Sequence, residues 1–370
     1  MTWQKSEENP VITAPPPDVR ARAGGHFRDP YVWKEDGWWY LIIGSRVENA
    51  GGLILLYRSR DLVHWEYLHP LMVGDIHGQD PCRAGTMWEC PNLFRLGDRH
   101  VLLFSVQATA YDHLYPVYHV GTYTDQRFTP EAGGILVHGE FYAPQVMHLD
   151  DGRLILWGWI EEGRSQQASG RAGWAGVMSL PLALTLQPGC RVAVEPVREL
   201  QALREQHWHF EALEVRPEQS DSGPGDCGSS GPLGGVRGDC LEIVAEFELG
   251  ASAEFGLVLC CSPDGQEQTR VVYQAAQCQI VVERDDSSSS PDVDRGERTA
   301  PVELAVGESL ELHIFLDNSV LEVFCNGGRT CLATRIYPQQ PDSLGIGVFA
   351  RSGAALLKSI DIWALGSIWI

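Results

Sequence analysis

The feature of this chain that most restricts its fold is an internal repeat. Three segments each begin with a proline and have the pattern of a strand, a polar turn and a second strand. They occupy residues 30–44, 91–105 and 144–158, and all three have the same length. The prolines stand 61 and 53 residues apart. This period is typical of four-stranded β-propeller blades that are joined by long loops.

The pattern between and around the repeats also favours β-structure. Short runs of aromatic, aliphatic and β-branched residues alternate with turn residues such as Asp36-Gly37 and Asp151-Gly152, and helical periodicity is nearly absent. Many short strands at regular spacing predict an all-β chain.

The pattern changes near residue 190, and from about residue 205 alternating strands of the kind found in a β-sandwich follow. We therefore expect a β-propeller over 1–190, a linker over 191–204 and a β-sandwich over 205–370. Two loops within the last region, 217–238 and 284–298, are rich in polar residues. Because they have little apolar content, we expect them to be mobile insertions.

Charge and hydropathy exclude several classes of protein. The formal net charge is −21 and no run of Lys or Arg occurs, so a nucleic-acid partner is not expected. No apolar run is long enough to cross a membrane, and the first residues lack the apolar core of a signal peptide. These patterns predict a soluble, cytoplasmic protein without a membrane partner.

The ten cysteines do not form a recognisable framework. Cys260 and Cys261 are adjacent and cannot easily bridge each other, and no Cys-x-x-Cys pair is present. We expect reduced thiols that are mostly buried, and neither a metal nor a cofactor.

The residues just before the repeat prolines are the candidate functional residues. If each repeat opens the innermost strand of a blade, these residues occupy equivalent places around the central channel. They are Asp29 in the first repeat, Glu89 and Cys90 in the second, and Tyr142 and Ala143 in the third. The repeat therefore predicts two carboxylates and a tyrosine in one axial pocket.

Asp29 and Glu89 suit glycoside hydrolysis. That reaction needs a carboxyl group to protonate the leaving oxygen and carboxylate charge beside an oxocarbenium-like transition state. Glu89 lies between Trp88 and Cys90, and a poorly hydrated site favours the protonated form of a carboxyl group. Asp29 follows Arg28, and a neighbouring cation favours the ionised form.

Either motif alone would be ordinary turn chemistry. Asp80-Pro81 is a further Asp-Pro pair, but no strand–turn–strand pattern follows it, so we assign it to a loop. The shared position in the repeat is what distinguishes Asp29 and Glu89.

Several motifs together make the chain similar to glycoside hydrolase family 32, which contains invertases, fructan hydrolases and fructosyltransferases. The matching segments are FRDP at 27–30, WECP at 88–91, FYAPQ at 141–145, LWGW at 156–159, GWAGVMSLP at 173–181 and DNSVLEVF at 317–324. Residues 363–369 also resemble the closing strand of that family.

The resemblance implies a fold and an activity. The family has a five-bladed β-propeller followed by a β-sandwich, and it cleaves β-fructofuranosidic bonds with retention and without a cofactor. It implies that Glu89 is the general acid/base and that Asp29 stabilises the transition state. The residues that it implies for substrate binding are Arg28, Trp88, Cys90 and Tyr142.

The chain also departs from the family pattern. The family nucleophile is an aspartate in an Asn-Asp-Pro motif at least one blade before Asp29, whereas only 28 residues precede Asp29. Asn9-Pro10 lacks the aspartate between its two residues. By comparison with the family, we therefore expect the propeller over 1–190 to be partial and the nucleophile to be absent from this chain. Glu140 replaces a shorter acid and Leu182 replaces an arginine, and either change is expected to alter the rim of the pocket.

Two functional hypotheses follow. The first is a β-fructofuranosidase that is weak or inactive alone and is completed by an N-terminal fragment. The alternative is a non-catalytic fructoside-binding or decayed member of the family. The expected partner in both is a small sugar, and the sequence does not choose among sucrose, inulin, levan and transfer to another fructose.

Overall fold

The computed structural model describes residues 2–17, 19, 26–108, 112–217, 232–233, 235–250 and 252–369. Nearly all regular structure in these ranges is β-strand, and the one α-helix among them, α1, spans only Gln166–Ala172. Two short 3₁₀ helices, η1 (Pro81–Arg83) and η2 (Arg198–Leu203), complete the elements. No helix in the described ranges is long and apolar enough to span a membrane.

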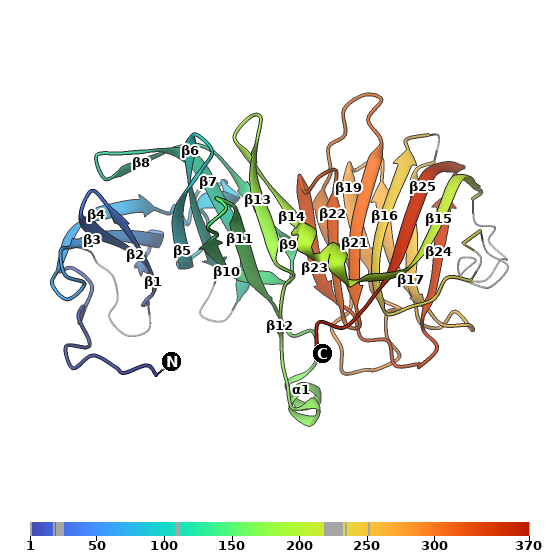
Figure 1. Cartoon of the computed structure of the whole chain (residues 1–370), viewed down its shortest axis with the longest axis horizontal. Coiled ribbons are helices and arrows are strands. Elements are labelled where there is room, and N and C mark those ends of the chain that lie inside the picture. The colour runs from blue at the N-terminus through green and yellow to red at the C-terminus, as the bar shows by residue number, and fades with distance from the viewer. Residues whose placement is uncertain are drawn as a thin grey trace. The chain divides into compact units, whose positions relative to one another are not determined.

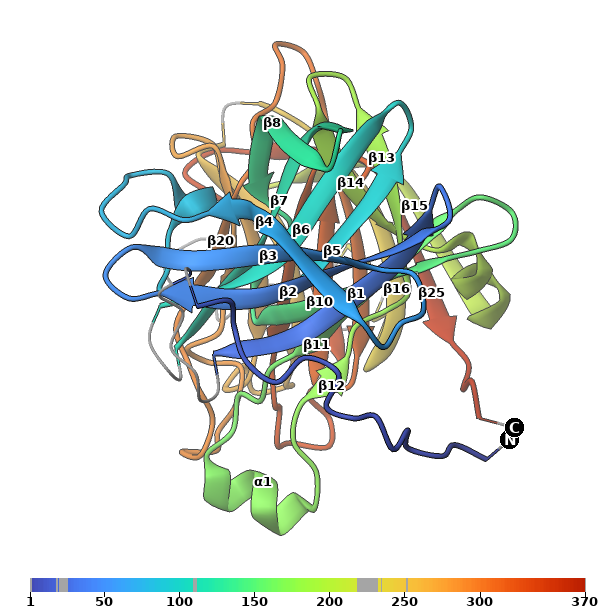
Figure 2. The same ribbon diagram turned by 90° about the vertical axis from the view of Figure 1, so that its left-hand side faces the viewer.

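Each repeat forms the first two strands of an antiparallel sheet (Figure 1). The first sheet has the order β1-β2-β3-β4, and Figure 2 shows β1, β2 and β3 side by side. Its strands are β1 (Phe27–Glu35), β2 (Trp38–Val47), β3 (Gly51–Ser59) and β4 (Trp65–Val73). The second sheet has the order β5-β6-β7-β8, with β5 (Met87–Leu96), β6 (Arg99–Gln107), β7 (His113–Thr124) and β8 (Arg127–Ile135).

The third sheet has the order β10-β11-β13-β14, and the short strand β12 pairs with β11. Its strands are β10 (Phe141–His148), β11 (Leu154–Ile160), β12 (Val177–Met178), β13 (Leu182–Gln187) and β14 (Arg191–Pro196). The three sheets repeat one strand order, as expected of propeller blades.

Two further sheets form the β-sandwich. One has the order β15-β25-β16-β21-β22-β23-β9, and the other has the order β20-β19-β18-β17-β24. The strands of the first are β15 (Arg204–Val215), β25 (Ala355–Leu365), β16 (Cys240–Glu248), β21 (Leu310–Asp317), β22 (Val320–Cys325), β23 (Thr330–Arg335) and β9 (His138–Gly139). Those of the second are β20 (Arg298–Pro301), β19 (Gln279–Glu283), β18 (Thr269–Gln274), β17 (Glu254–Cys261) and β24 (Gly345–Arg351).

Alternation of apolar and polar residues gives each sandwich sheet an inward face. One cluster of buried side chains includes Phe247 of β16, Phe255 of β17 and Tyr273 of β18. The rings of Phe247 and Phe255 lie 5.1 Å apart and those of Phe255 and Tyr273 lie 5.6 Å apart. The predicted all-β architecture, a partial propeller followed by a sandwich, is confirmed.

Contacts divide the chain into two compact units. The first comprises Met1–Leu136, Tyr142–Gly158 and Leu184–Val192, and the second comprises Val137–Phe141, Trp159–Ala183 and Ala193–Ile370. The bounds expected from the sequence, 1–190, 191–204 and 205–370, stay a prediction.

The expectation of a mobile loop at 284–298 is wrong. Ser287 and Ser288 are buried, and the side chain of Arg284 has no exposed surface. The Glu267 carboxylate accepts a hydrogen bond from the Ser289 amide at 2.7 Å, and Arg284 donates to the carbonyl of Arg335 at 2.9 Å. Polar contacts order this loop in place of apolar burial. Most of the other loop, 217–238, lies outside the described residues.

Glu322, in the DNSVLEVF motif, makes the stability of the sandwich depend on pH. Burial raises the pKa of the Glu322 carboxyl group from 4.5 to about 8. A hydrogen bond from the Leu180 amide at 3.1 Å acts in the opposite direction but is the smaller effect. Between pH 4.5 and 8 the unfolded chain ionises at this position while the folded chain stays protonated. The folded state therefore loses stability as the pH rises, by at most roughly 4 to 5 kcal/mol.

We predict that Glu322→Gln stabilises the protein relative to the parent at pH 8 and has much less effect at pH 5. Glutamine keeps the shape and the acceptor oxygen but does not ionise. Urea unfolding of both proteins at the two pH values measures the difference, and Glu311→Gln at an exposed position of β21 is the control. A difference between Glu322→Gln and the parent that does not change with pH would contradict the prediction.

Candidate active site

The backbone before each repeat proline is left-handed. The φ angle is +61° at Asp29, +48° at Cys90 and +50° at Ala143, which is uncommon for residues other than glycine. The pairing of β1 with β2 and of β5 with β6 shifts register at the same positions. Bulges of this kind change the direction of side chains that regular alternation would fix.

The three residues that precede the left-handed positions meet at one carboxylate. Arg28 donates to Glu89 Oε1 from Nε at 2.9 Å and from Nη2 at 2.7 Å. Tyr142 Oη donates to Glu89 Oε2 at 2.7 Å. The Glu89 side chain is only 11% exposed, so these donors replace much of the water that a free carboxylate would bind. Equivalent positions of three sheets thus supply a cation, a carboxylate and a phenol to one point.

Asp29 lies beside this cluster. Its Oδ2 accepts a hydrogen bond from the Cys90 amide at 3.1 Å, with the Cys90 thiol at 3.6 Å, and lies 4.0 Å from Arg28 Nε. The same Arg28 Nε is 2.9 Å from Glu89 Oε1, so the two carboxylate oxygens are separated by at most the sum of these distances, about 7 Å. This upper limit is compatible with the separation of carboxyl pairs in glycosidases.

Arg28 lies near Asp29, as its adjacency in sequence suggested, with 4.0 Å between Arg28 Nε and Asp29 Oδ2. Its hydrogen bonds, however, go to Glu89 and, at 3.3 Å, to Gln107 Oε1. Asp29 has a left-handed backbone, and its carboxylate accepts its hydrogen bond from the Cys90 amide.

Trp88 does not lie where its predicted role in sugar binding would place it. It is fully buried, its ring lies 4.2 Å from that of Phe104, and its Nε1 donates to the carbonyl of Ala84 at 2.9 Å. A Cβ on Gly52 would come within 2.2 Å of the Trp88 ring, so the site of the ring is tightly closed. Trp88 therefore holds the start of β5 in place and has no surface to offer a ligand.

The structure adds residues that the motifs did not indicate. Gln107 and Asn92 are buried beside the cluster. The Asn92 amide donates to the carbonyls of Cys90 at 2.9 Å and Pro144 at 3.0 Å, and so links the second repeat to the third. The ring of His113 stacks on Tyr142 at 4.2 Å. No motif marks these residues, because their roles depend on contacts between sheets.

The repeat did contain a signal at its last position. Ser105 occupies this position in the second repeat, where the first and third have Gly44 and Gly158. Ser105 Oγ accepts a hydrogen bond from the Ala143 amide at 3.0 Å, which supports the left-handed residue of the next repeat. At Gly44 a Cβ would lie 2.3 Å from the Trp88 carbonyl oxygen, so the backbone of β5 requires glycine there.

The two departures noted in the sequence have local explanations. Glu140 Oε1 accepts a hydrogen bond from Arg298 Nε at 2.6 Å and forms an ion pair with Arg284 Nη1 at 3.2 Å. Leu182 is buried at 1% exposure.

Asp80, assigned to a loop, accepts a hydrogen bond from the Cys82 amide and caps η1.

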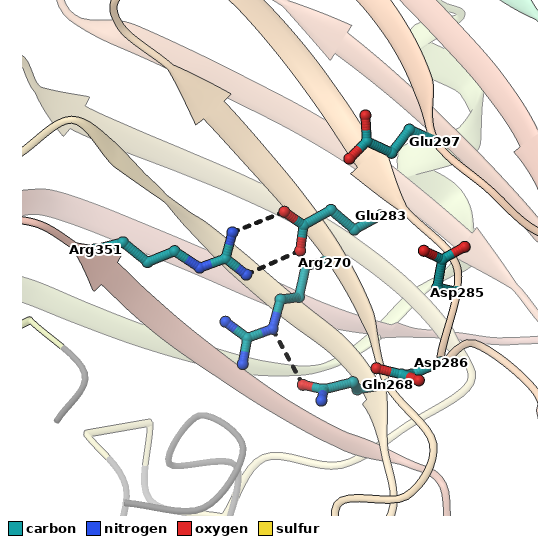
Figure 3. A pocket seen from close by; sticks show the side chains of 7 residues that line it. All are labelled: Gln268, Arg270, Glu283, Asp285, Asp286, Glu297 and Arg351. Carbon is teal, nitrogen blue, oxygen red and sulfur yellow. Dashed lines mark hydrogen bonds and ion pairs between the residues drawn. The ribbon is translucent and has the colours of Figure 1, made fainter. Parts of the chain in front are cut away.

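A charged hollow of about 430 Å³ lies on the sandwich sheet that contains β17 and β24 (Figure 3). Every residue lining it is charged or carries an amide: Gln268, Arg270, Glu283, Asp285, Asp286, Glu297 and Arg351. Arg351 donates two hydrogen bonds to the Glu283 carboxylate, at 2.7 and 2.9 Å. With no aromatic ring among its lining residues to stack on a sugar, this hollow is the weaker candidate for a sugar site.

Comparison with known proteins identifies the family. Residues 1–196 match the N-terminal domain of the glycosyl hydrolases family 32, and residues 199–364 match the C-terminal domain of that family. The chain belongs to glycosyl hydrolase family 32. The resemblance inferred from the motifs, and with it the class of β-fructofuranosidase-type hydrolases, is confirmed.

Relatives of this family 32 chain are found among curated and solved proteins. It is 34% identical to the sucrose-6-phosphate hydrolase of Zymomonas mobilis, over 95% of this chain and 67% of that protein. A β-fructofuranosidase of Bombyx mori, solved in complex with sucrose, is 26% identical with a TM-score of 0.71 over 98% of this chain and 70% of that one.

A fructan 1-exohydrolase of Cichorium intybus, solved in complex with 1-kestose, is 24% identical. Its TM-score is 0.82, and the match covers 99% of this chain and 76% of that one. This likeness shows the shared fold. The chain spans about two thirds of the length of the Zymomonas relative.

We predict that the Cys90 thiol reacts slowly although it is partly exposed. Burial, together with the charges of Asp29 and Glu89, raises its pKa to about 12, so very little thiolate is present at pH 8. Alkylation by iodoacetamide at pH 8, followed by peptide mass spectrometry, should label exposed Cys278 first and Cys90 at least about 100-fold more slowly.

Asp29→Asn removes one of the neighbouring charges and should speed the labelling of Cys90 while leaving that of Cys278 unchanged. Labelling of Cys90 at the rate of Cys278 in the parent protein would show that the thiol does not lie in the site as described.

Proposed function

We propose that this family 32 chain supplies the acid/base half of a retaining β-fructofuranosidase that acts on sucrose-type β-fructofuranosides. The observation that carries the proposal is the position of Glu89, held between Arg28 and Tyr142 with Asp29 within about 7 Å. A general acid and a nearby charge-stabilising carboxylate are groups that glycoside hydrolysis uses.

Glu89 is the group that transfers the proton. When it protonates the leaving oxygen it becomes a carboxylate in a site where its side chain is only 11% exposed. Arg28 and Tyr142 then donate to the two oxygens of that carboxylate, and hydrogen bonds that strengthen as charge develops favour the transition state. In the second half of the reaction the same carboxylate accepts a proton from water.

Asp29 stabilises positive charge on the sugar. The Cys90 amide fixes its carboxylate at 3.1 Å, and the thiol adds a weak donor at 3.6 Å, so the negative charge is oriented in advance. Such preorganised charge stabilises the transition state without reorganisation at the moment of reaction. In this proposal Arg28 and Tyr142 also line the fructose subsite, while Trp88 acts only through packing.

Retention of configuration needs one more group. A nucleophilic carboxylate must lie about 5 to 5.5 Å from the acid and attack the anomeric carbon in line. The described cluster contributes Glu89 and Asp29, which the proposal assigns to proton transfer and charge stabilisation. The proposal therefore requires a third carboxylate from an Asn-Asp-Pro segment of the kind found in the family.

The substrate class rests on the relatives. The relatives named above are called a sucrose-6-phosphate hydrolase and a β-fructofuranosidase, and the second was solved with sucrose. We propose a sucrose-type fructoside, with the terminal fructose bound at Arg28 and Tyr142. A cytoplasmic location, expected from the first residues, stays a prediction.

We predict that the 370-residue chain alone releases no fructose above background from sucrose, sucrose 6-phosphate, 1-kestose, inulin or levan between pH 4 and 8. Addition of an N-terminal segment with the Asn-Asp-Pro motif, taken from a family 32 relative, should restore release. Loss of one member of a catalytic unit usually costs several orders of magnitude, because its parts act together. Reducing-sugar assays with the purified proteins measure the release.

In the restored protein, Glu89→Gln should abolish release, and Tyr142→Phe should lower kcat by about 10- to 100-fold. Glu66→Gln, at an exposed carboxylate of β4, is the control and should leave the rate unchanged. Robust turnover by the chain alone that Asp29→Asn abolishes would overturn the proposal, because Asp29 would then be the nucleophile. Sucrose binding without turnover in the restored protein would favour the non-catalytic alternative.

A further inference from the structure

A second group of reactive side chains lies on the seven-stranded sandwich sheet. His207 and His209 are two residues apart on β15, so both project from the same face of the sheet. The antiparallel partner β25 places Asp361 opposite His209 and Trp363 opposite His207. Two imidazoles and one carboxylate therefore meet across a pair of strands.

The distances bring the three groups to one point. Asp361 Oδ1 lies 2.7 Å from His207 Nε2 and 2.8 Å from His209 Nδ1. All three atoms are within 4.8 Å of one another. A tetrahedral ion with ligands at 2.0–2.1 Å would separate each pair of ligand atoms by roughly 3.3 Å. Side-chain rotations that shift the ligand atoms by about 1 Å to 1.5 Å would bring the three atoms to that spacing.

A second carboxylate fixes the orientation of the His209 ring. His209 directs its second nitrogen, Nε2, to Glu211 Oε1 at 3.1 Å. A carboxylate that accepts from the far nitrogen is the usual support of a metal-binding histidine, because it fixes the orientation of the ring and raises its basicity.

The ring of His207 stacks on Trp363 at 4.7 Å with the planes 5° apart. The Trp363 indole also contacts the Arg204 guanidinium, which lies 3.8 Å from the ring centre. Arg204 in turn donates hydrogen bonds to Glu242 at 2.6 and 2.7 Å. The position of His207 is therefore set by a stacked row of side chains, which reduces the entropy lost when it binds a ligand.

We propose that His207, His209 and Asp361 bind one Zn²⁺ ion. The ion would take His207 Nε2, His209 Nδ1 and Asp361 Oδ1 as ligands and complete a tetrahedron with water. Imidazole and carboxylate are good ligands for zinc, and a three-ligand site with a water is a common zinc arrangement. The exposed positions of both histidines give the ion access from solvent.

The ion would join the two ends of the sandwich domain. β15 is the edge strand of its sheet and is bonded to β25, which contains the last regular residues of the chain. A metal bound across this pair adds a cross-link to the backbone hydrogen bonds. Because the unfolded chain does not hold the three ligands together, zinc binding would raise the unfolding temperature by mass action.

Titration of the metal-free full chain with zinc chloride at pH 8 tests the proposal by calorimetry. We expect a saturable site with one equivalent of Zn²⁺ and a rise in the unfolding temperature on loading. His207→Ala or His209→Ala should weaken the affinity at least about 100-fold. Glu211→Gln should weaken it about 10-fold, since it removes only the support of His209. Circular dichroism checks that each variant is folded.

His64→Ala is the matched control. His64 is an exposed histidine that contacts a carboxylate, Asp61, at 2.8 Å, but no third ligand completes that pair among the described residues. This variant should bind zinc like the parent. Cobalt loading separates the proposed site from cysteine ligation, because nitrogen and oxygen ligands give visible bands without the thiolate charge-transfer band in the near ultraviolet.

A double variant, His207→Ala with His209→Ala, that binds Zn²⁺ as tightly as the parent would overturn the proposal. A cobalt spectrum dominated by thiolate charge transfer would do the same. Retained affinity in His64→Ala, together with its loss in both single variants, would support it.

Discussion

The candidate site depends on one backbone feature, the left-handed residue before each repeat proline. Asp29, Cys90 and Ala143 adopt a conformation that costs non-glycine residues about 1 kcal/mol or more. Contacts between the repeats hold two of them, since the Cys90 amide donates to Asp29 and the Ala143 amide to Ser105. The same feature turns Arg28, Glu89 and Tyr142 toward one another. Backbone strain and functional geometry therefore have a common origin.

The buried charge of the site depends on its hydrogen-bond donors. A carboxylate as buried as Glu89 is costly unless donors replace its water, and removal of one partner from a buried pair usually costs several kcal/mol. Arg28 and Tyr142 are these donors, with Gln107 behind the arginine. Such donors stabilise the carboxylate that remains after a general acid gives up its proton, as acid/base catalysis requires.

The sequence predicted much of this arrangement, because the repeat is a local pattern. The prolines and the strand–turn–strand segments specified the blades and the equivalence of Asp29 and Glu89. The burial of Trp88 was not predictable, because it depends on Gly52 and Phe104 of other strands. The partner of Arg28 followed from bulge geometry that no motif encodes. The zinc ligands were missed because Asp361 is far from His207 in sequence and only strand pairing joins them.

The central claim, that Arg28 and Tyr142 act on the same buried carboxylate, is tested most directly by a double-mutant cycle. The free energy of unfolding is measured for the parent, Arg28→Met, Tyr142→Phe and the double variant. If both donors serve Glu89, the two effects are coupled by roughly 0.5 to 3 kcal/mol. Effects that add to within about 0.3 kcal/mol would mean that the two side chains do not share this partner.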